Sequence, residues 1–275
     1  MASAPPVYIA PPDTGSLRVG LGDFVQSLRR WRLWTLLGWT EIRQRYARSR
    51  LGPFWLTIST GVMILCVGLV FGVLFHQPMQ QYLPLFGVGL IVWTLISTIV
   101  NEGATAYVNA ASYMRQIHSP RLIYIFQAVW RNLIIFFHNL VIVACLMAIF
   151  GVRHPAAIPL AVPGLLLLVL NASWMGALAG LVSTRYRDVP QIITSLMLVG
   201  FYVTPVMYER SMLKSHAGLL LYNPFTYLLT DLRRPFLGEY PSPRDWFIAA
   251  AMAAVGWVVV IILTGRYHRR LSYWL

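Results

Sequence analysis

Six apolar runs follow one another between Thr57 and Thr264, separated by shorter polar segments. A helix needs about 20 mostly apolar residues to cross the hydrocarbon core of a membrane. A helix is also the expected spanning element, because lipid cannot satisfy free backbone groups. We therefore expect an all-α membrane protein with six transmembrane helices, at about residues 57–76, 83–100, 122–150, 158–182, 192–207 and 246–264.

The residue composition supports this class. Hydrophobic residues make up 57% of the 275 residues and charged residues only 11%, whereas soluble domains carry about a quarter charged residues. Met1–Leu28 has no apolar core after a basic start. We therefore expect no cleavable signal peptide, and membrane insertion through the internal spans.

The formal net charge of +13 admits two explanations, nucleic-acid binding and the collection of basic residues in cytoplasmic loops. With six spans, fifteen of the 22 Lys and Arg fall on the side of the two termini and six on the other side, while Arg131 lies inside a span. This bias predicts cytoplasmic termini. It makes nucleic acid a minor possibility, and we expect no nucleic-acid partner.

Outside the spans the chain has three further parts. Residues 1–16 are proline-rich and predict a disordered tail, so 17–275 forms a single membrane domain. Residues 17–46 have apolar residues at helical spacing with arginines on another side, which suits a helix in the membrane interface or, equally, a helix packed on protein. Tyr208–Asp245 is apolar but broken at Asn223-Pro224, which predicts an outer re-entrant helical hairpin.

Several kinds of chemistry are missing from the pattern. None of the nine acids falls in the middle of an expected span, which disfavours ion coupling and paired-carboxylate glycoside chemistry. The six histidines are scattered, so we assign no metal. The only lysine, Lys214, follows Leu213, so there is no P-loop. We expect a chain that is not an enzyme and, if transport is ATP-driven, a separate ATPase.

Four arginines precede the first span: Arg43, Arg45, Arg48 and Arg50. Guanidinium groups bind phosphate oxygens through two parallel bonds, so a pyrophosphate headgroup would suit them. Contact with ordinary anionic lipids explains them equally well.

Polar and aromatic residues inside the spans are also ambiguous. Arg131 and His138 share one helix face and either line a path or, as we favour, serve an interhelical contact. Four aromatic residues lie within or near the spans: Trp93, Trp130, Trp174 and Tyr202. Together they could line a carbohydrate path, because aromatic rings pack on the apolar faces of sugars. For any single one, we favour the simpler explanation of lipid contact or core packing.

The order of short motifs resembles the permease subunits of type-2 ABC polysaccharide exporters, of the O-antigen (Wzm) type. The motifs are EIRQRYARSRLGPFWLTIS from Glu41, MRQIHSPRL from Met114, RYRDVPQI from Arg185, FYVTPVMY from Phe201, LYNPFTYLL from Leu221 and the ending GRYHRRLSYWL. The resemblance covers roughly residues 20–275. It departs from the family at His118-Ser119, where an aromatic pair usually precedes Pro-Arg, and at Arg131.

This resemblance implies a homodimer in the bacterial inner membrane with two copies of a separate ATPase, which would hold ATP and Mg. The substrate would be a polysaccharide linked to a polyprenyl pyrophosphate, with its headgroup near the four arginines and its glycan along the four aromatic residues. A coupling helix, about Gly103–Gln116, would contact the ATPase through Tyr107, Asn109, Tyr113, Met114 and Arg115. The outer gate would lie within Ser211–Phe236, at Tyr222, Asn223, Pro224 and Phe225.

Three rival functions remain open. One is export of teichoic acid or capsule by a permease of the same family. A membrane enzyme acting on lipid-linked glycans would need an intramembrane acid or nucleophile cluster, which the sequence does not display. An ion-coupled transporter would need buried carboxylates, and we detect no inverted repeat of the kind such transporters have.

Overall fold

The computed structural model describes residues 16–47, 52, 54–116, 119–152, 154–209, 212, 218 and 220–274. Within these ranges the chain is helical and contains no strand, which confirms the expected all-α class. The helices are α1 Ser16–Arg29, α2 Trp31–Tyr46, α3 Phe54–Leu74, α4 Met79–Asn109, α5 Ala111–Gln116, α6 Leu122–Phe150, η1 Pro155–Leu160, α7 Ala161–Arg185, α8 Val189–Val203, α9 Pro224–Phe236, α10 Pro243–Arg266 and α11 His268–Trp274.

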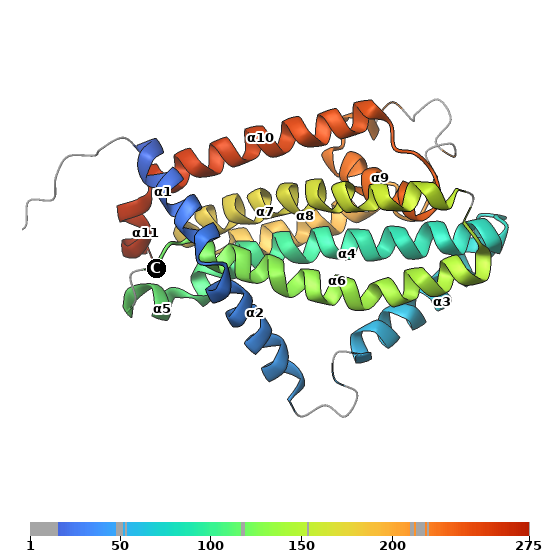
Figure 1. Ribbon diagram of the computed structural model, residues 1–275, viewed down its shortest axis with the longest axis horizontal. Coiled ribbons are helices and arrows are strands. Elements are labelled where there is room, and N and C mark those ends of the chain that lie inside the picture. Colours follow the sequence, from blue (N-terminus) through green and yellow to red (C-terminus); the bar gives the residue numbers. More distant parts are fainter. Residues whose placement is uncertain are drawn as a thin grey trace, which may run out of the picture.

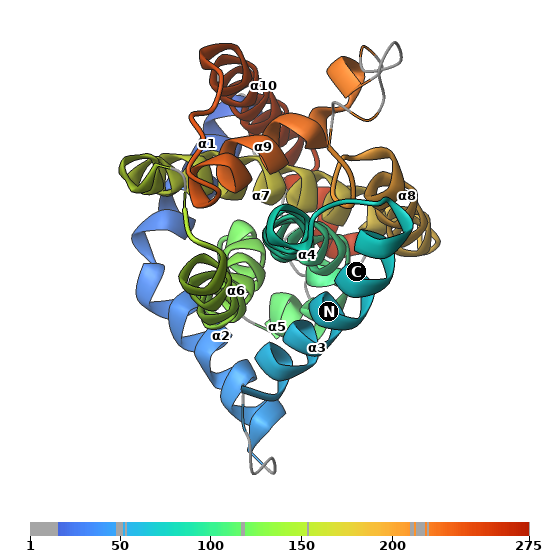
Figure 2. The same ribbon diagram turned by 90° about the vertical axis from the view of Figure 1, so that its right-hand side faces the viewer.

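Helix α4 forms the centre of a bundle of roughly parallel helices. Figure 2 looks along this bundle and shows α3, α6, α7 and α8 around α4. Most of α4 is buried, whereas α3 exposes apolar residues such as Val70 and Val73 along its length. Figure 1 shows α1, α5 and α11 at one end of the bundle, which we call the terminal end, and α9 at the other, the distal end.

Five helical segments are long and apolar enough to cross a membrane: α3, α4, α6, η1 with α7, and α10. The sixth expected span corresponds to α8, which has only 15 residues and rises about 22 Å at 1.5 Å per residue. We expected this span to continue to Met207. The helix ends at Val203 instead, because Thr204 turns to an extended conformation before Pro205, and the residue before a proline disfavours helix.

Helices α4 and α7 approach each other closely through glycines. A Cβ atom added to Gly103 would lie 2.5 Å from the Cα of Gly176, and one added to Gly180 would lie 2.6 Å from the carbonyl oxygen of Gly103. Such contacts let two backbones meet directly. The Gly176–Gly180 pair in the sequence therefore does mark a close helix contact.

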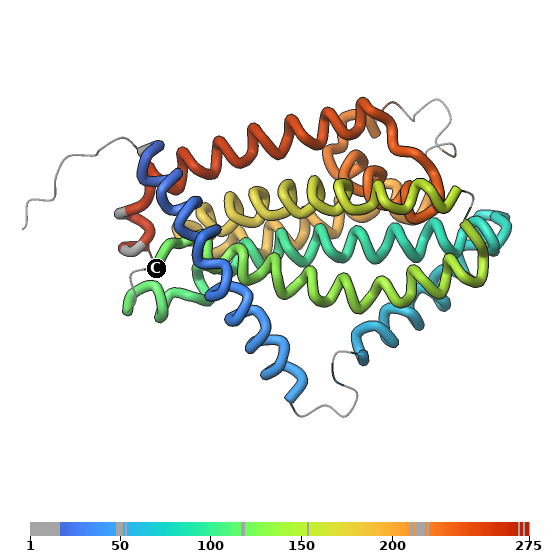
Figure 3. Tube along the Cα trace, viewed as in Figure 1, coloured from blue at the N-terminus to red at the C-terminus, as the bar shows by residue number. Residues whose placement is uncertain are grey.

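The expected single interface helix over 17–46 is two helices with a junction at Arg30. Figure 3 follows the chain as α1 crosses the terminal end and α2 continues along the outside of the bundle. Helix α1 packs on α10 and α2 packs on α6, while Trp31 and Trp39 remain exposed. The segment thus packs on protein with one side and presents aromatic residues on the other.

The expected coupling helix, about Gly103–Gln116, is also divided. Its first part completes α4, because burial of Gly103, Ala104 and Tyr107 against neighbouring helices extends that helix to Asn109. Its second part is the short helix α5. At the distal end, α9 falls within the segment of the expected hairpin, whereas most of 210–219 lies outside the described residues, so the hairpin stays a prediction.

Candidate functional site

The structure describes two of the four arginines assigned to the lipid headgroup. Arg43 and Arg45 lie exposed in the last turn of α2. At this end of a helix, positive side chains interact favourably with the negative pole of the helix dipole. Arg48 and Arg50 lie outside the described residues. The headgroup assignment therefore stays a prediction.

Beside Arg43 and Arg45, an ionic network joins three helices. Arg131 of α6 donates from Nη1 to Glu41 Oε2 of α2, and from Nη2 to Glu102 Oε2 of α4 at 2.6 Å. Buried charges need such pairing, because each loses its hydration on leaving water. This is the interhelical role that we favoured for Arg131. His138 lies two turns further along α6. Its ring nitrogen Nδ1 is 2.8 Å from the carbonyl oxygen of Ile134 in the same helix.

Amide side chains extend the network. Gln127 donates to Glu41 Oε1 at 2.6 Å, and Asn132 donates to Glu102 Oε2. The expected second span stopped at Val100 and left Glu102 outside it, but α4 continues past Glu102. Sequence reasoning therefore missed a carboxylate inside a helix of the bundle, and the only signal for it was the unpaired Arg131.

A cavity of about 390 Å³ lies over this network, between α2, α4 and α6, with α5 at one edge. Its wall combines charged and polar side chains, among them Glu41, Glu102 and Arg131, with apolar residues of α2 and α6. Cavities of this size with a few convergent polar groups are the usual form of small-molecule sites.

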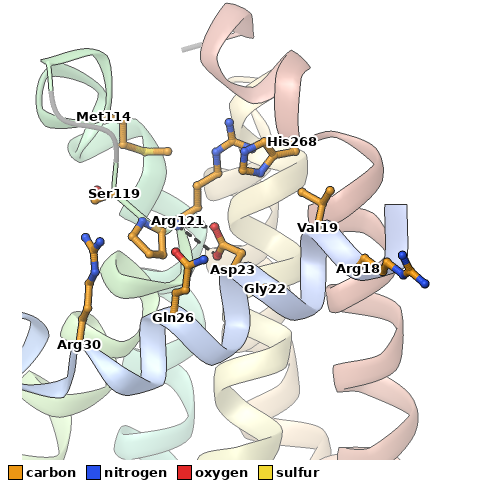
Figure 4. A pocket seen from close by; sticks show the side chains of 11 residues that line it. Arg18, Val19, Gly22, Asp23, Gln26, Arg30, Met114, Ser119, Arg121 and His268 are labelled. Atoms are coloured by element: carbon orange, nitrogen blue, oxygen red, sulfur yellow. Dashed lines mark hydrogen bonds between the residues drawn. The ribbon is translucent and has the colours of Figure 1, made fainter. Parts of the chain in front are cut away.

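A second cavity, of about 450 Å³, lies at the terminal end (Figure 4). Asp23 of α1 points from its wall to the start of α6. Its carboxylate accepts hydrogen bonds from the backbone N–H groups of Arg121, at 2.9 and 3.1 Å, and of Leu122, at 3.1 Å. A carboxylate satisfies the free donors at a helix N-terminus and interacts favourably with its positive pole. Asp23 thus caps α6 from another helix.

The side chain of Arg121 is buried next to this cap. Burial lowers the pKa of its guanidinium, and the charge of Asp23 opposes that shift. Because Arg121 follows the loop after α5, the terminal cavity joins α1, the α5–α6 loop and α11 in one place.

The five residues assigned to ATPase contact do not form one surface. Tyr107 is fully buried against α7. Asn109, Tyr113 and Arg115 are exposed, and Met114 is half-buried at the edge of the terminal cavity. Of the set, the exposed residues at the terminal end are the ones accessible to a partner.

The four aromatic residues assigned to the glycan path are not brought together. Trp93 is buried, with its ring 5.5 Å from Phe225 and 6.1 Å from Phe201. Trp130 packs on Trp34 of α2, and Trp174 packs over Gly256 of α10. Tyr202 is 64% exposed on α8. Of these four residues, only Tyr202 presents an open ring within one chain.

The residues assigned to the outer gate lie at the start of α9. Asn223 caps this helix by accepting from the Phe225 backbone N–H at 3.0 Å, and Pro224 occupies the first helical position. Tyr222 is 88% exposed, whereas Phe225 packs on Trp93.

Three side chains hold the turn after α8 against the distal end. Asn223 donates to Thr204 Oγ1 at 3.0 Å, Arg233 of α9 donates to the Pro205 carbonyl at 2.6 Å, and Tyr82 of α4 donates to the Met207 carbonyl at 3.0 Å. The bonds from Arg233 and Tyr82 satisfy backbone carbonyls where α8 ends early. The start of α9 is therefore tied to the end of α8.

No cofactor or metal site is evident in the part of the chain that the structure describes. There, no group of three or more His, Cys, Asp or Glu side chains is placed to hold a metal ion. The cavities offer instead guanidinium, carboxylate and amide groups, which bind by hydrogen bonding and charge.

An all-helical bundle with five helical segments long and apolar enough to cross a membrane is the architecture of a multi-pass membrane protein. The chain belongs to the ABC-2 type transporter family, whose model matches residues 32–237. That range begins in α2 and includes both the ionic network and α9. The resemblance to type-2 ABC permeases is thereby confirmed, and the chain is a multi-pass membrane protein.

Among characterised relatives, the chain is similar to the O-antigen export system permease protein RfbA of Myxococcus xanthus. The two sequences are 27% identical over 236 residues, which cover 84% of this chain and 89% of the relative.

Proposed function

We propose that this chain is the transmembrane subunit of an ATP-driven exporter that moves a polysaccharide linked to polyprenyl pyrophosphate out of the cytoplasm. The observation that carries this proposal is the similarity to an O-antigen export permease over most of both chains, within the ABC-2 family. The exposed arginines in the last turn of α2 support a substrate with an anionic headgroup.

In this proposal two copies form one channel in the bacterial inner membrane, with both termini in the cytoplasm and α8 as a short sixth crossing. Two ATPase subunits, which bind ATP and Mg, dock at the terminal end against α5. The exposed apolar face of α8, which includes Leu196, Val199 and Tyr202, supports contact with the second copy or with the glycan. Asn223 and Arg233 position the outer gate through the turn after α8.

The headgroup would bind at Arg43, Arg45, Arg48 and Arg50. Their conversion to Gln removes four positive charges and should abolish export, while the protein still inserts and retains its ATPase. Polymer on the cell surface measures export, and co-purification measures ATPase docking. Arg266 and Arg270 at the far end of the chain, converted to Gln, provide the matched control. Unchanged export in the four-Gln variant would return these arginines to an anchoring role.

Isolation of the tagged chain in mild detergent tests the assembly itself. A stoichiometric partner with a P-loop is expected, and the polymer held by the complex identifies O-antigen, teichoic acid or capsule. A preparation without any ATPase, even after cross-linking, would refute ATP-driven export.

A further inference from the structure

The lining of the cavity between α2, α4 and α6 disfavours both the phosphate and the acyl chain of a phospholipid. Glu41 and Glu102 face it with a single guanidinium, that of Arg131, between them. The excess of negative charge disfavours a phosphate in the cavity. An acyl chain is disfavoured as well, because it would leave these polar groups in contact with hydrocarbon.

Within the ionic network, the carboxylates are more accessible than the guanidinium group. The side chain of Glu41 is 39% exposed and that of Glu102 26%, whereas Arg131, at 14%, lies behind them. Among the described residues, Oε1 of Glu102 accepts no hydrogen bond. Carboxylate oxygens of this kind accept bonds from hydroxyl groups and require no charge on the ligand.

Groups that both donate and accept hydrogen bonds also line the cavity. Gln44 at the end of α2 and Asn109 at the end of α4 are exposed there, and neither side chain takes part in the ionic network. Tyr113 of α5 adds an aromatic ring that is 60% exposed. Carboxylates, amides and an open aromatic face together match the hydroxyls and the apolar faces of a sugar ring.

The cavity also lies next to the arginines. Gln44 lies between Arg43 and Arg45 in the last turn of α2, and the charge of Arg45 acts on Glu102. A ligand with a phosphate at these arginines can therefore extend a neighbouring group into the cavity. In a glycan linked through pyrophosphate, that neighbouring group is a sugar.

We propose that this cavity binds the sugar unit attached to the lipid pyrophosphate, while Arg43 and Arg45 contact the pyrophosphate outside it. This inference rests on the proposed function and adds a selection step to it. The permease would distinguish a prenyl pyrophosphate that carries a glycan from one that has none, before the polymer enters the channel.

Two probes test the proposal on the full chain in lipid nanodiscs: a short-chain prenyl pyrophosphate that carries one hexose, and the same prenyl pyrophosphate without the sugar. The wild type should bind the hexose probe at least about tenfold more tightly. In the variant Gln44→Leu with Asn109→Leu that preference should disappear, because each lost hydrogen bond weakens binding of the hexose probe by about fivefold. Gln191→Leu, an exposed glutamine near the start of α8, is the matched control and should keep the preference.

The sugar-free probe serves as an internal measure of folded protein, because it binds outside the cavity and its Kd should be the same in all three proteins. Equal affinity of the wild type for both probes, or an unchanged preference in the double variant, would overturn the sugar site alone. Failure of the wild type to bind either probe would overturn the proposed substrate together with the sugar site.

Discussion

The role of Arg131, a charged residue inside a span, follows from its partners on other helices. It lies between carboxylates from two other helices, and its own Nε has no hydrogen-bond partner among the described residues. Removal of one member of such a group leaves the others buried without compensation, whereas removal of all charges together costs much less.

We therefore expect Arg131→Gln to destabilise the protein by up to about 3–5 kcal/mol, toward the lower end because Glu41 is partly exposed. The triple variant Glu41→Gln, Arg131→Gln, Glu102→Gln should regain most of that loss. Thermal unfolding in detergent measures both. A triple variant that is less stable than the single one would show that the charges themselves stabilise the contact.

Asp231 of α9 predicts a pH dependence at the distal end. Its side chain is buried, and neither carboxyl oxygen has a hydrogen-bond partner among the described residues. Burial raises its pKa to about 7; the charge of Asp245 acts in the same direction and that of Arg234 against it. The folded state thus favours the protonated form, whereas the unfolded chain releases the proton near pH 4.

The contribution of Asp231 to stability is therefore complete below about pH 4 and is lost as the pH rises through 7. We expect the wild-type Tm to fall between pH 5 and pH 8, and Asp231→Asn to remove most of that slope. Glu239→Gln is the control: it changes an acid with a partly exposed side chain near the same end, and the slope of Tm against pH should stay as in the wild type. Equal slopes in wild type and Asp231→Asn would contradict the assignment.

At the scale of elements, Asp23 of α1 caps α6 although it lies 98 positions before Arg121, whose backbone N–H donates to it. Asp23→Ala should destabilise the first turn of α6 by about 1 kcal/mol. Hydrogen exchange at the backbone of Leu122 and Ile123 reports this directly. Gln26→Ala is the control: its side chain lies one turn further on α1 in the wall of the same cavity but bonds no backbone group of α6 among the described residues, so the exchange should stay unchanged.

The crossing of α4 and α7 depends on the absence of a side chain at Gly103. In Gly103→Ala the new methyl group would meet Gly176 backbone atoms at 2.5 to 3.0 Å, so the helices must separate, and we expect a loss of about 1–3 kcal/mol. Gly22→Ala is matched to it, because a Cβ there meets no atom within 4 Å. That variant should be neutral or stabilising in the same unfolding assay.

At the scale of the whole molecule, α1 and α11 lie at the same end of the bundle (Figure 1), although α8 is shorter than a full span. The positive residues concentrate at that end, which predicts that it is cytoplasmic. Its described part also carries α5, so the proposed ATPase contact would occur on that side.

Cysteine labelling tests this orientation. In a chain with Cys66 and Cys145 replaced by Ala, we place single cysteines at three exposed positions, Arg18, Tyr240 and Tyr273. In intact spheroplasts an impermeant maleimide should label position 240 and leave 18 and 273 unlabelled until the membrane is opened. Labelling at only one of 18 and 273 would mean an odd number of crossings.

The amino-acid sequence by itself determined the class of the protein, the bounds of most spanning helices and the bias of charge between the two ends. These features are local, because hydropathy, helix period and proline effects act within a window of about 20 residues. The third expected span, Leu122–Phe150, agrees with α6 at both ends.

Only the tertiary structure decided which helices are neighbours, and the candidate sites depend on that choice. It brought Glu41 and Glu102 to Arg131, and Asp23 to the start of α6. It also placed Trp93 in the core and left Tyr202 open. Polar side chains inside a bundle find partners far away in the chain, because a buried charge must be compensated wherever an opposite group happens to pack.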